Sequence, residues 1–172
     1  PIQYSNTYLF YKRGWNGLCI DPNPMLSAKW SKHRPRDNFI NLGVSKDAAE
    51  LSYMEHIKYP ALNFLFDADS DPAELHDPNY SLTKTIKTTT LFEILEHNTV
   101  INDFDFLNID CEGMDLEVLE SMKLERYRPR VICIEDRNKP LHGKIHQILN
   151  DQGYSFSASI GISKVYTNTS NQ

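Results

Sequence analysis

Long apolar stretches are absent from the sequence: no run approaches the roughly 18 residues that a membrane-spanning helix requires. The pattern of a secretory signal peptide is absent too. Hydrophobic residues nevertheless make up 40% of the 172 residues, enough for a globular core in one domain. We therefore expect a cytoplasmic protein that has no membrane partner.

Positive charge is scarce. The 18 Lys and Arg residues are outnumbered by 23 Asp and Glu residues, which gives a net charge of −5. Proteins that bind nucleic acid through phosphate contacts carry a block of basic residues. The richest basic stretch here, residues 29–36, is explained at least as well by the solvated end of a helix. We expect no nucleic-acid partner.

Cysteine is rare, with Cys19, Cys111 and Cys133 and no Cys-x-x-Cys pair. An odd count without paired spacing argues against a disulfide framework or a zinc ribbon. Each cysteine lies in or at the end of an apolar, strand-like run. We read all three as reduced core residues of a cytoplasmic protein. The histidines offer no metal motif either, because nothing like His-Glu-x-x-His accompanies His142 and His146.

What the sequence does contain is an alternation of short apolar runs and helical patterns. The alternation favours an α/β fold, a Rossmann-like, doubly wound and mostly parallel sheet with helices on both faces, in a single domain of residues 1–172. The apolar runs predict strands, and the 3.6-residue periodicity predicts the helices between them. Strands are expected at 17–21, 39–45, within 104–113, and at 129–136, 154–158 and 163–166, with an exposed strand at 49–55. Helices are expected at 8–11, 25–32, from 90, 114–122 and around 145–149. The segment 58–81 predicts a long loop or lid with marginal structure.

The stretch from Phe104 to Gly113 organises this pattern, because a buried strand ends there in two carboxylates, Asp110 and Glu112. Open α/β sheets build active sites at the carboxyl ends of their strands. Side chains alternate along an extended strand, so we expect both carboxylates on the same face. Two other strands also end in acids, at Asp21 and at residues 135–136, and in a parallel sheet all three ends are expected on one edge. The plainer interpretation is that the two carboxylates only favour the N-terminus of the next helix.

The position of Asp21 is where Rossmann-like nucleotide binders place an acid for ribose hydroxyls. A glycine-rich turn should precede it, yet only four residues come before Ser5. We therefore expect the domain to be N-terminally incomplete, without its first strand and glycine-rich loop. An oxidoreductase that uses nicotinamide would employ the same acid, together with a hydride-site pair such as Tyr-x-x-x-Lys that we do not assign.

An ordered set of motifs resembles the FkbM-type methyltransferases. The resemblance spans about Ser5 to Glu135; each motif alone is weak, and the ordered set is fairly specific. It implies a Rossmann-like fold that binds S-adenosylmethionine and transfers a methyl group to a hydroxyl group, often on a sugar or a natural product. The motifs are Ser5-Asn6-Thr7-Tyr8, Gly14 to Pro24, Asn41-Leu42-Gly43-Val44-Ser45, Phe106 to Asp115 and Arg128 to Glu135.

The resemblance also implies roles for individual residues. Asp21 would bind the cofactor ribose, with Pro22 and Asn23 flanking the adenosine. The other cofactor-binding positions implied are Val44 and Ser45, near the adenine, and Asn6. Asp110 and Glu112 would be the catalytic pair near the reacting methyl group and the acceptor hydroxyl. Methyl transfer needs in-line positioning and removal of the hydroxyl proton, which a carboxylate can accept.

Three alternatives stay open. Asp110, standing nearest the buried strand, is favoured as the base, but it could instead orient the cofactor while Glu112 caps the helix. Asp110, Asp136 and Asn138 could offer oxygen ligands to magnesium, although we assign no metal. A domain of this fold could also bind a nucleotide or cofactor without catalysing a reaction. The expected partner is a small-molecule or saccharide acceptor, and the sequence carries no signal for an oligomeric state.

Overall fold

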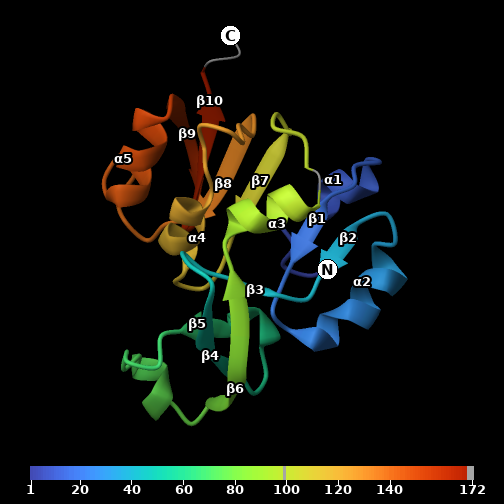
Figure 1. Cartoon of the computed structure of the whole chain (residues 1–172), viewed down its shortest axis with the longest axis vertical. Coiled ribbons are helices and arrows are strands. Elements are labelled where there is room, and N and C mark those ends of the chain that lie inside the picture. Colours follow the sequence, from blue (N-terminus) through green and yellow to red (C-terminus); the bar gives the residue numbers. More distant parts are fainter. Residues whose placement is uncertain (99, 170–172) are drawn as a thin grey trace. The chain divides into compact units, whose positions relative to one another are not determined.

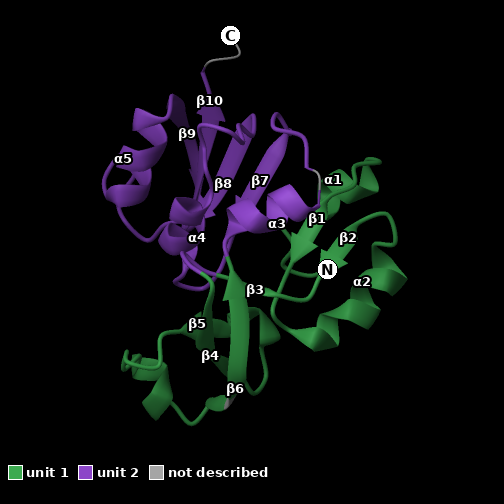
Figure 2. Ribbon diagram, viewed as in Figure 1, with its two compact units in different colours: residues 1–44, 48–89 green, residues 45–47, 90–172 purple. Residues whose placement is uncertain are grey.

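The computed structural model describes residues 1–98 and 100–169. The chain divides into two compact units, shown in Figure 2: unit 1 comprises residues 1–44 and 48–89, and unit 2 comprises residues 45–47 and 90–172. The elements follow one another along the chain as labelled in Figure 1. Within the described ranges, no helix combines the length and the apolar character that crossing a membrane requires.

The first part of unit 1 is a small parallel pair of strands with two helices. Strand β1 pairs in parallel with β2, in the register Cys19↔Phe39. Asn23 caps the 3-10 turn that follows β1, because its Oδ1 accepts from the Met25 amide at 3.0 Å. The elements are α1 (Tyr8–Lys12), β1 (Leu18–Ile20), η1 (Pro24–Leu26), α2 (Ser27–His33) and β2 (Asn38–Ile40).

A buried arginine holds this part of unit 1 together. The Arg34 side chain is 3% exposed and its Nε donates to Asp37 Oδ2 at 2.5 Å. The guanidinium group lies 4.3 Å from the ring centroid of Trp30. It also donates to the Thr7 hydroxyl at 2.8 Å, which fixes the segment just before α1. An ion pair, a cation–π contact and hydrogen bonds therefore all hold the Arg34 guanidinium group in place.

The second part of unit 1 is a four-stranded sheet in the order β3-β6-β4-β5. Strand β3 is parallel to β6, whereas β4 is antiparallel to both β6 and β5. Tyr53 of β4 is buried, and its hydroxyl accepts from Asn63 Nδ2 at 2.9 Å, which ties β4 to the loop before β5. The elements are β3 (Gly43–Val44), β4 (Ala49–His56), η2 (Pro60–Leu62), β5 (Phe64–Phe66), η3 (Ala73–His76) and β6 (Tyr80–Thr89).

Unit 2 contains the predicted central strand. Its sheet has the order β7-β8-β10-β9, with β7 and β8 parallel and the other neighbours antiparallel. Ile132 and Ile134 of β8 and Leu149 of α5 are fully buried and form its core. The elements are α3 (Leu91–His97), β7 (Phe106–Ile109), α4 (Asp115–Ser121), β8 (Val131–Glu135), α5 (Lys144–Asp151), β9 (Tyr154–Ile160) and β10 (Ser163–Asn168).

The predicted doubly wound, mostly parallel Rossmann-like sheet is wrong. The described residues form three separate sheets, and only the pairs β1-β2, β3-β6 and β7-β8 are parallel. Parallel neighbours need a crossover of a dozen or more residues, whereas a tight turn forces antiparallel pairing. Only residues 161 and 162 separate β9 from β10, and residues 49–89 contain strands and 3-10 turns but no crossover helix. The fold is therefore a mixed α/β arrangement.

Candidate active site

The turn that follows β7 carries the two predicted catalytic acids. The strand ends at Ile109, so the exposed Asp110 already lies beyond it. Glu112 adopts a left-handed conformation with φ of 51°, and Gly113 has φ of 111°. The expectation that Asp110 and Glu112 share a strand face is therefore wrong, because the chain turns instead of continuing extended.

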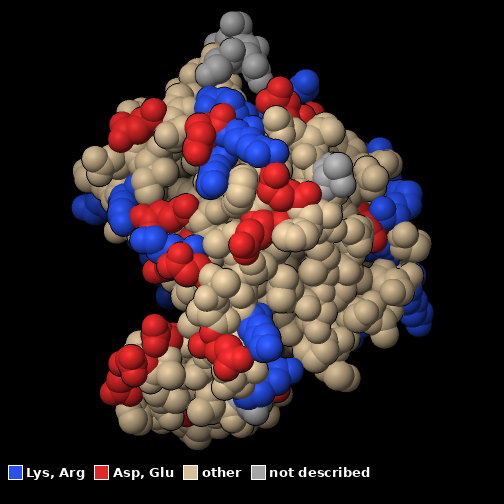
Figure 3. Space-filling model, in the orientation of Figure 1, with Lys and Arg blue, Asp and Glu red and all other residues tan. Residues whose placement is uncertain are grey.

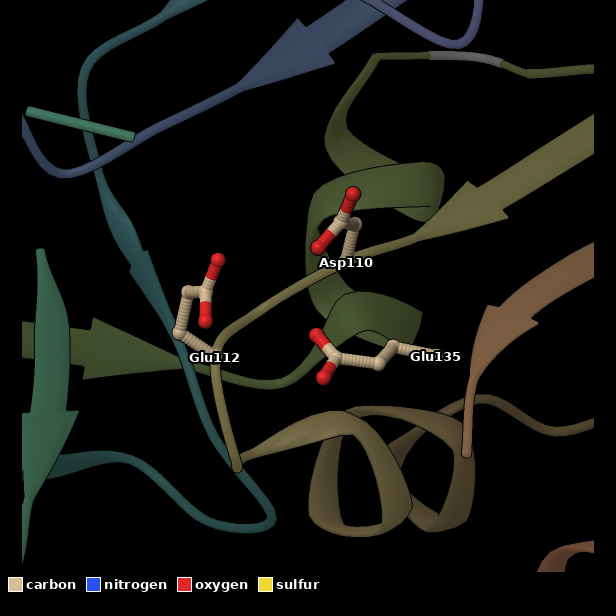
Figure 4. Close-up of side chains that lie close together, drawn as sticks. All are labelled: Asp110, Glu112 and Glu135. Atoms are coloured by element: carbon tan, nitrogen blue, oxygen red, sulfur yellow. The ribbon is translucent and has the colours of Figure 1, made fainter. Parts of the chain in front are cut away.

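The two acids nevertheless lie close together, and a third joins them. Single carboxylate oxygens of Asp110, Glu112 and Glu135 lie within 4.8 Å of one another. Figure 4 shows the three carboxyl groups gathered around one space, two from the turn after β7 and one from the end of β8. Ile109 pairs with Ile134 in the parallel register, which brings the ends of the two strands together. We call these three residues the acid cluster.

An arginine from the loop after β8 borders the acid cluster. Arg137 Nε lies 3.0 Å from Glu135 Oε1, and one terminal nitrogen lies 3.8 Å from Glu112 Oε2. Glu135 is 5% exposed, whereas the Arg137 side chain is 72% exposed. The arginine thus partly neutralises a buried carboxylate while remaining in contact with water.

The electrostatics of the turn set Glu112 apart. Burial, together with the neighbouring charges of Glu135 and Asp110, raises the pKa of Glu112 to about 7, and Arg137 opposes this shift. Burial also raises the pKa of Asp115 to about 6, although hydrogen bonds from backbone amides oppose the shift. A carboxyl group whose pKa is close to neutrality can accept a proton and release it again under physiological conditions.

A small open hollow of about 160 Å³ lies beside the acid cluster. Asp136 contributes to its wall but is engaged locally, because its Oδ1 accepts from the backbone N and the Nδ2 of Asn138 at 3.0 and 2.8 Å. The acid cluster thus differs from the set of Asp110, Asp136 and Asn138 that the sequence offered as magnesium ligands.

Acidic groups gather in many proteins without a metal, so the acid cluster alone does not identify a metal site. The hollow is lined by Gly113, Asp115, Leu116, Glu135, Asp136, Arg137 and Ile145.

In unit 1, the predicted ribose ligand Asp21 follows β1 directly. Its backbone amide donates to Ile40 O at 3.1 Å, which continues the pairing of β1 with β2. Its Oδ1 accepts from the Asn23 amide at 2.8 Å, so Pro22 sits inside a tight turn. Among the described residues, Oδ2 accepts no hydrogen bond and is available to a ligand. Burial raises the pKa of Asp21.

The remaining predicted cofactor residues have varied surroundings. Asn6 is exposed in the segment before α1. Val44 ends β3 and is half-buried. Ser45 is buried, and its hydroxyl donates to Asp47 O at 2.5 Å. The Ser45 side chain is therefore committed to its own turn, and a contact with a ligand would come from its backbone.

Sequence reasoning missed two contributors to the site, Asp115 and Arg137. Asp115 begins α4, and its carboxylate accepts from the amides of Cys111 and Gly113 at 2.9 and 3.1 Å. The available signal was an acid two residues after a glycine. For Arg137 the signal was a cation directly after two strand-end acids. Glu135 was identified as a strand-end acid but not assigned to the site.

The charged surroundings of the site are mixed in sign. On the face shown in Figure 3, Lys and Arg side chains are interspersed with Asp and Glu side chains. Within unit 2, Glu120 lies 2.5 Å from Lys144 and 3.5 Å from Lys46. Burial and pairing, more than a large field of one sign, therefore govern the charge of the acid cluster.

Strand-end acids beside a hollow are a feature of many α/β enzymes, and comparison with protein families narrows the class to methyltransferases. The family model of the methyltransferase FkbM domain matches residues 1–156 of the 172, and the chain belongs to this family. No match was found among curated proteins or among solved structures. A Tyr-x-x-x-Lys spacing does occur in α1, at Tyr8 and Lys12, so the family match is what argues against a nicotinamide enzyme.

Proposed function

We propose that the protein transfers a methyl group from S-adenosylmethionine to a hydroxyl group of a saccharide or a small natural product. The observation that carries the proposal is the acid cluster, which in a member of a methyltransferase family offers a proton acceptor with a pKa near 7. When bound, S-adenosylmethionine supplies a methyl group on a sulfonium. In the proposed reaction the acceptor oxygen would form a bond to the methyl carbon as the carbon–sulfur bond breaks, the sulfur would keep the bonding electron pair, and the hydroxyl proton would pass to the protein.

The proton acceptor in this proposal is Glu112. A general base is most effective when its pKa lies near the working pH, and the raised pKa of Glu112 meets this condition. Asp110 is exposed and lies at the outer end of the acid cluster. It would orient the acceptor hydroxyl by accepting a hydrogen bond, while Glu135 and Arg137 set the charge around Glu112. Both predicted catalytic residues thus keep a role, with the base assigned to Glu112.

The cofactor-binding role proposed for unit 1 rests on Asp21. A free Oδ2 on a half-buried carboxylate suits a ribose hydroxyl, because a charged acceptor gives a strong hydrogen bond. The Asx turn fixes this carboxylate through the Asn23 amide, with Pro22 in the turn, and these two residues would flank the adenosine. Val44, the backbone of Ser45 and Asn6 complete the proposed set.

We also propose that the protein acts in the cytoplasm. All three cysteines are free thiols, and Cys133 is buried. Free thiols are typical of proteins that stay in a reducing compartment. Neither a nucleic acid nor a membrane is part of the proposed reaction.

The proposal is tested with S-adenosylmethionine that carries a labelled methyl group, incubated with a panel of monosaccharides, glycosides and hydroxylated small molecules. We expect a labelled product that survives mild base, as an ether does and an ester does not. Glu112→Gln should lower the rate by about 10²–10⁴-fold, whereas Glu117→Gln, which removes one charge from the first turn of α4, should not.

Calorimetric titrations with S-adenosylmethionine and with NAD provide the second part of the test. Binding of S-adenosylmethionine with turnover supports the proposal. Binding of S-adenosylmethionine without turnover on any acceptor supports a non-catalytic domain instead. Binding of NAD but not S-adenosylmethionine would contradict the cofactor assignment.

A further inference from the structure

We propose that Asp115 is a positioning residue: its carboxylate fixes the turn after β7 and so holds the Glu112 carboxyl group against Asp110 and Glu135. The catalytic meaning of this inference rests on the proposed function. The structural part concerns one turn and one side chain, and it can be measured without any methyl acceptor.

The turn needs such support because of its backbone. Glu112 has φ of 51° and Gly113 has φ of 111°, so two successive residues lie in the left-handed region. A non-glycine residue rarely adopts this conformation and keeps it only where its surroundings hold it. The backbone hydrogen bond that spans the turn, from the Met114 amide to Cys111 O, is long at 3.5 Å.

Asp115 supplies the support with both of its carboxylate oxygens. Oδ1 accepts from the Cys111 amide at 2.9 Å and Oδ2 accepts from the Gly113 amide at 3.1 Å. These two amides belong to the residues directly before and after Glu112. We call this pair of hydrogen bonds, which fixes the backbone on both sides of Glu112, the Asp115 bracket. Hydrogen bonds to an ionised acceptor are stronger than neutral ones.

The anchor of this bracket is rigid. Asp115 is 5% exposed and begins α4, whose Val118 and Leu119 are buried at 4% and 1% exposure. The turn is thus tied to the core of unit 2 through the first residue of a packed helix. A loosened turn would let Glu112 swing away from the acid cluster and into water.

A purely electrostatic role at the start of α4 is the competing explanation. Asp115 and Glu117 both lie in the first turn of this helix, where a negative charge is favourable. The carboxylate that accepts from the Cys111 and Gly113 amides is that of Asp115. Replacing each acid by its amide therefore separates a general charge effect from the specific bracket.

The charged groups around Glu112 decide which measurements are informative. Glu135, Asp110 and Asp115 raise its pKa, and Arg137 lowers it. Removing the charge of Asp115 would therefore lower the pKa of Glu112 even in an unchanged turn. For this reason the primary measurement must report on the backbone, and the titration of Glu112 is supporting evidence.

The experiment compares amide hydrogen exchange of Cys111 and Gly113 in the wild type, Asp115→Asn and Glu117→Gln. An asparagine has the same shape, but only its oxygen accepts, so one of the two bonds must be lost. We expect exchange at these two amides to be at least about tenfold faster in Asp115→Asn, since local opening becomes easier. Glu117→Gln should match the wild type. Unchanged exchange in a folded Asp115→Asn protein would overturn the inference.

If Asp115→Asn does not fold, the pH dependence of amide exchange in the wild type tests the inference instead. Protection of the Cys111 and Gly113 amides, corrected for intrinsic exchange, should weaken as the pH falls through about 6, where Asp115 takes up a proton. Protection that is constant across this range contradicts the bracket. Where methyl transfer is measurable, Asp115→Asn should lower kcat by about 10²-fold at an unchanged affinity for S-adenosylmethionine. A wild type without methyl transfer but with these exchange effects would refute the proposed function and leave the positioning role standing.

Discussion

The guanidinium group of Arg137 contacts both Glu135 and Glu112 and opposes the rise in the pKa of Glu112. As the proposed base, Glu112 must be ionised, so the rate should increase with pH through its pKa of about 7. Removing the positive charge raises that pKa further. For Arg137→Gln we therefore expect the acidic limb of the profile of kcat/KM against pH to move to higher pH.

The matched control for this change is Lys139→Gln, which removes an exposed cation two residues further along the same loop. Because Arg137 is largely exposed, the shift should shrink in high salt. A profile for Arg137→Gln that coincides with those of the wild type and Lys139→Gln would remove Arg137 from the charge balance of Glu112.

Asp21 permits a second test on a single residue. Replacing it by alanine removes the proposed acceptor of the ribose hydroxyls, and hydrogen bonds to a charged group contribute about 1.5–3 kcal/mol. The affinity for S-adenosylmethionine should fall by roughly 10- to 150-fold in isothermal titration calorimetry. Asp69→Ala removes an exposed acid from the same unit and should leave the affinity unchanged. Equal affinities for a folded Asp21→Ala protein and the wild type would exclude Asp21 from the site.

Part of this site could be read from the sequence. Parallel pairing of acid-ended strands brings their ends together, and the structure confirms this for β7 and β8, where Asp110, Glu112 and Glu135 meet. The expectation is wrong for Asp21, because β1 belongs to a separate sheet. The backbone conformation that places Glu112 in the acid cluster could not be predicted from the sequence. Its left-handed backbone depends on hydrogen bonds to Asp115, which follow from the geometry of one turn and have no spacing rule in the sequence.

Among the elements, α2 and the segment after it depend on the pair of Arg34 and Asp37. The two side chains are 3% and 1% exposed, so each charge is compensated mainly by the other. Breaking a buried pair by removing one partner typically costs 3–5 kcal/mol, because the remaining charge stays buried. We expect Arg34→Gln to lower the free energy of unfolding by about 3 kcal/mol or more.

Urea denaturation measures this loss, and Lys32→Gln, at an exposed position in α2, is the control. The double variant Arg34→Gln with Asp37→Asn should recover part of the loss, because the unpaired charge is gone. An Arg34→Gln protein as stable as Lys32→Gln would show that the pair adds nothing to the stability of unit 1.

For individual helices and strands, the sequence patterns were sufficient in some places and insufficient in others. The helices around residues 8–11 and 114–122 are confirmed within one residue at each end. The strands expected within 104–113 and at 129–136 are confirmed with the shorter bounds 106–109 and 131–135. Thr90 also caps α3, as its side chain accepts from the Glu93 amide at 3.1 Å. Residues 58–81 were expected to be a loop with marginal structure, yet they contain β5 and two 3-10 turns. Elements of three or four residues are too short for any periodicity to show.

For the whole molecule, the pattern of elements did not determine how the strands pair. An alternation of strands and helices favours parallel pairing, and β7 with β8 follows this rule. Between β3 and α3, however, the chain runs through β4, β5 and β6, which pair antiparallel because long-range contacts of their side chains select the partner. Such contacts are distributed over residues far apart in the sequence, so the sheet order could not be derived from local patterns.

Protonation of the turn after β7 should also affect the stability of the folded chain. The pKa of Glu112 rises from 4.5 to about 7 on folding, and that of Asp115 from 3.8 to about 6. The folded state therefore binds more protons than the unfolded state between these values, and stability falls as the pH increases across this range. The contribution of Glu112 is fully present below pH 4.5 and lost as the pH rises through about 7.

Glu112→Gln isolates this contribution, because a neutral side chain does not titrate. We expect its free energy of unfolding, measured in urea at several pH values, to rise relative to the wild type between pH 4.5 and about 7 and then to stay at a constant difference. Glu117→Gln should give a curve parallel to that of the wild type, since it removes a similar charge without touching the acid cluster. Parallel curves for Glu112→Gln and the wild type would mean that Glu112 titrates normally, and the case for Glu112 as a base poised near neutrality would fail with them.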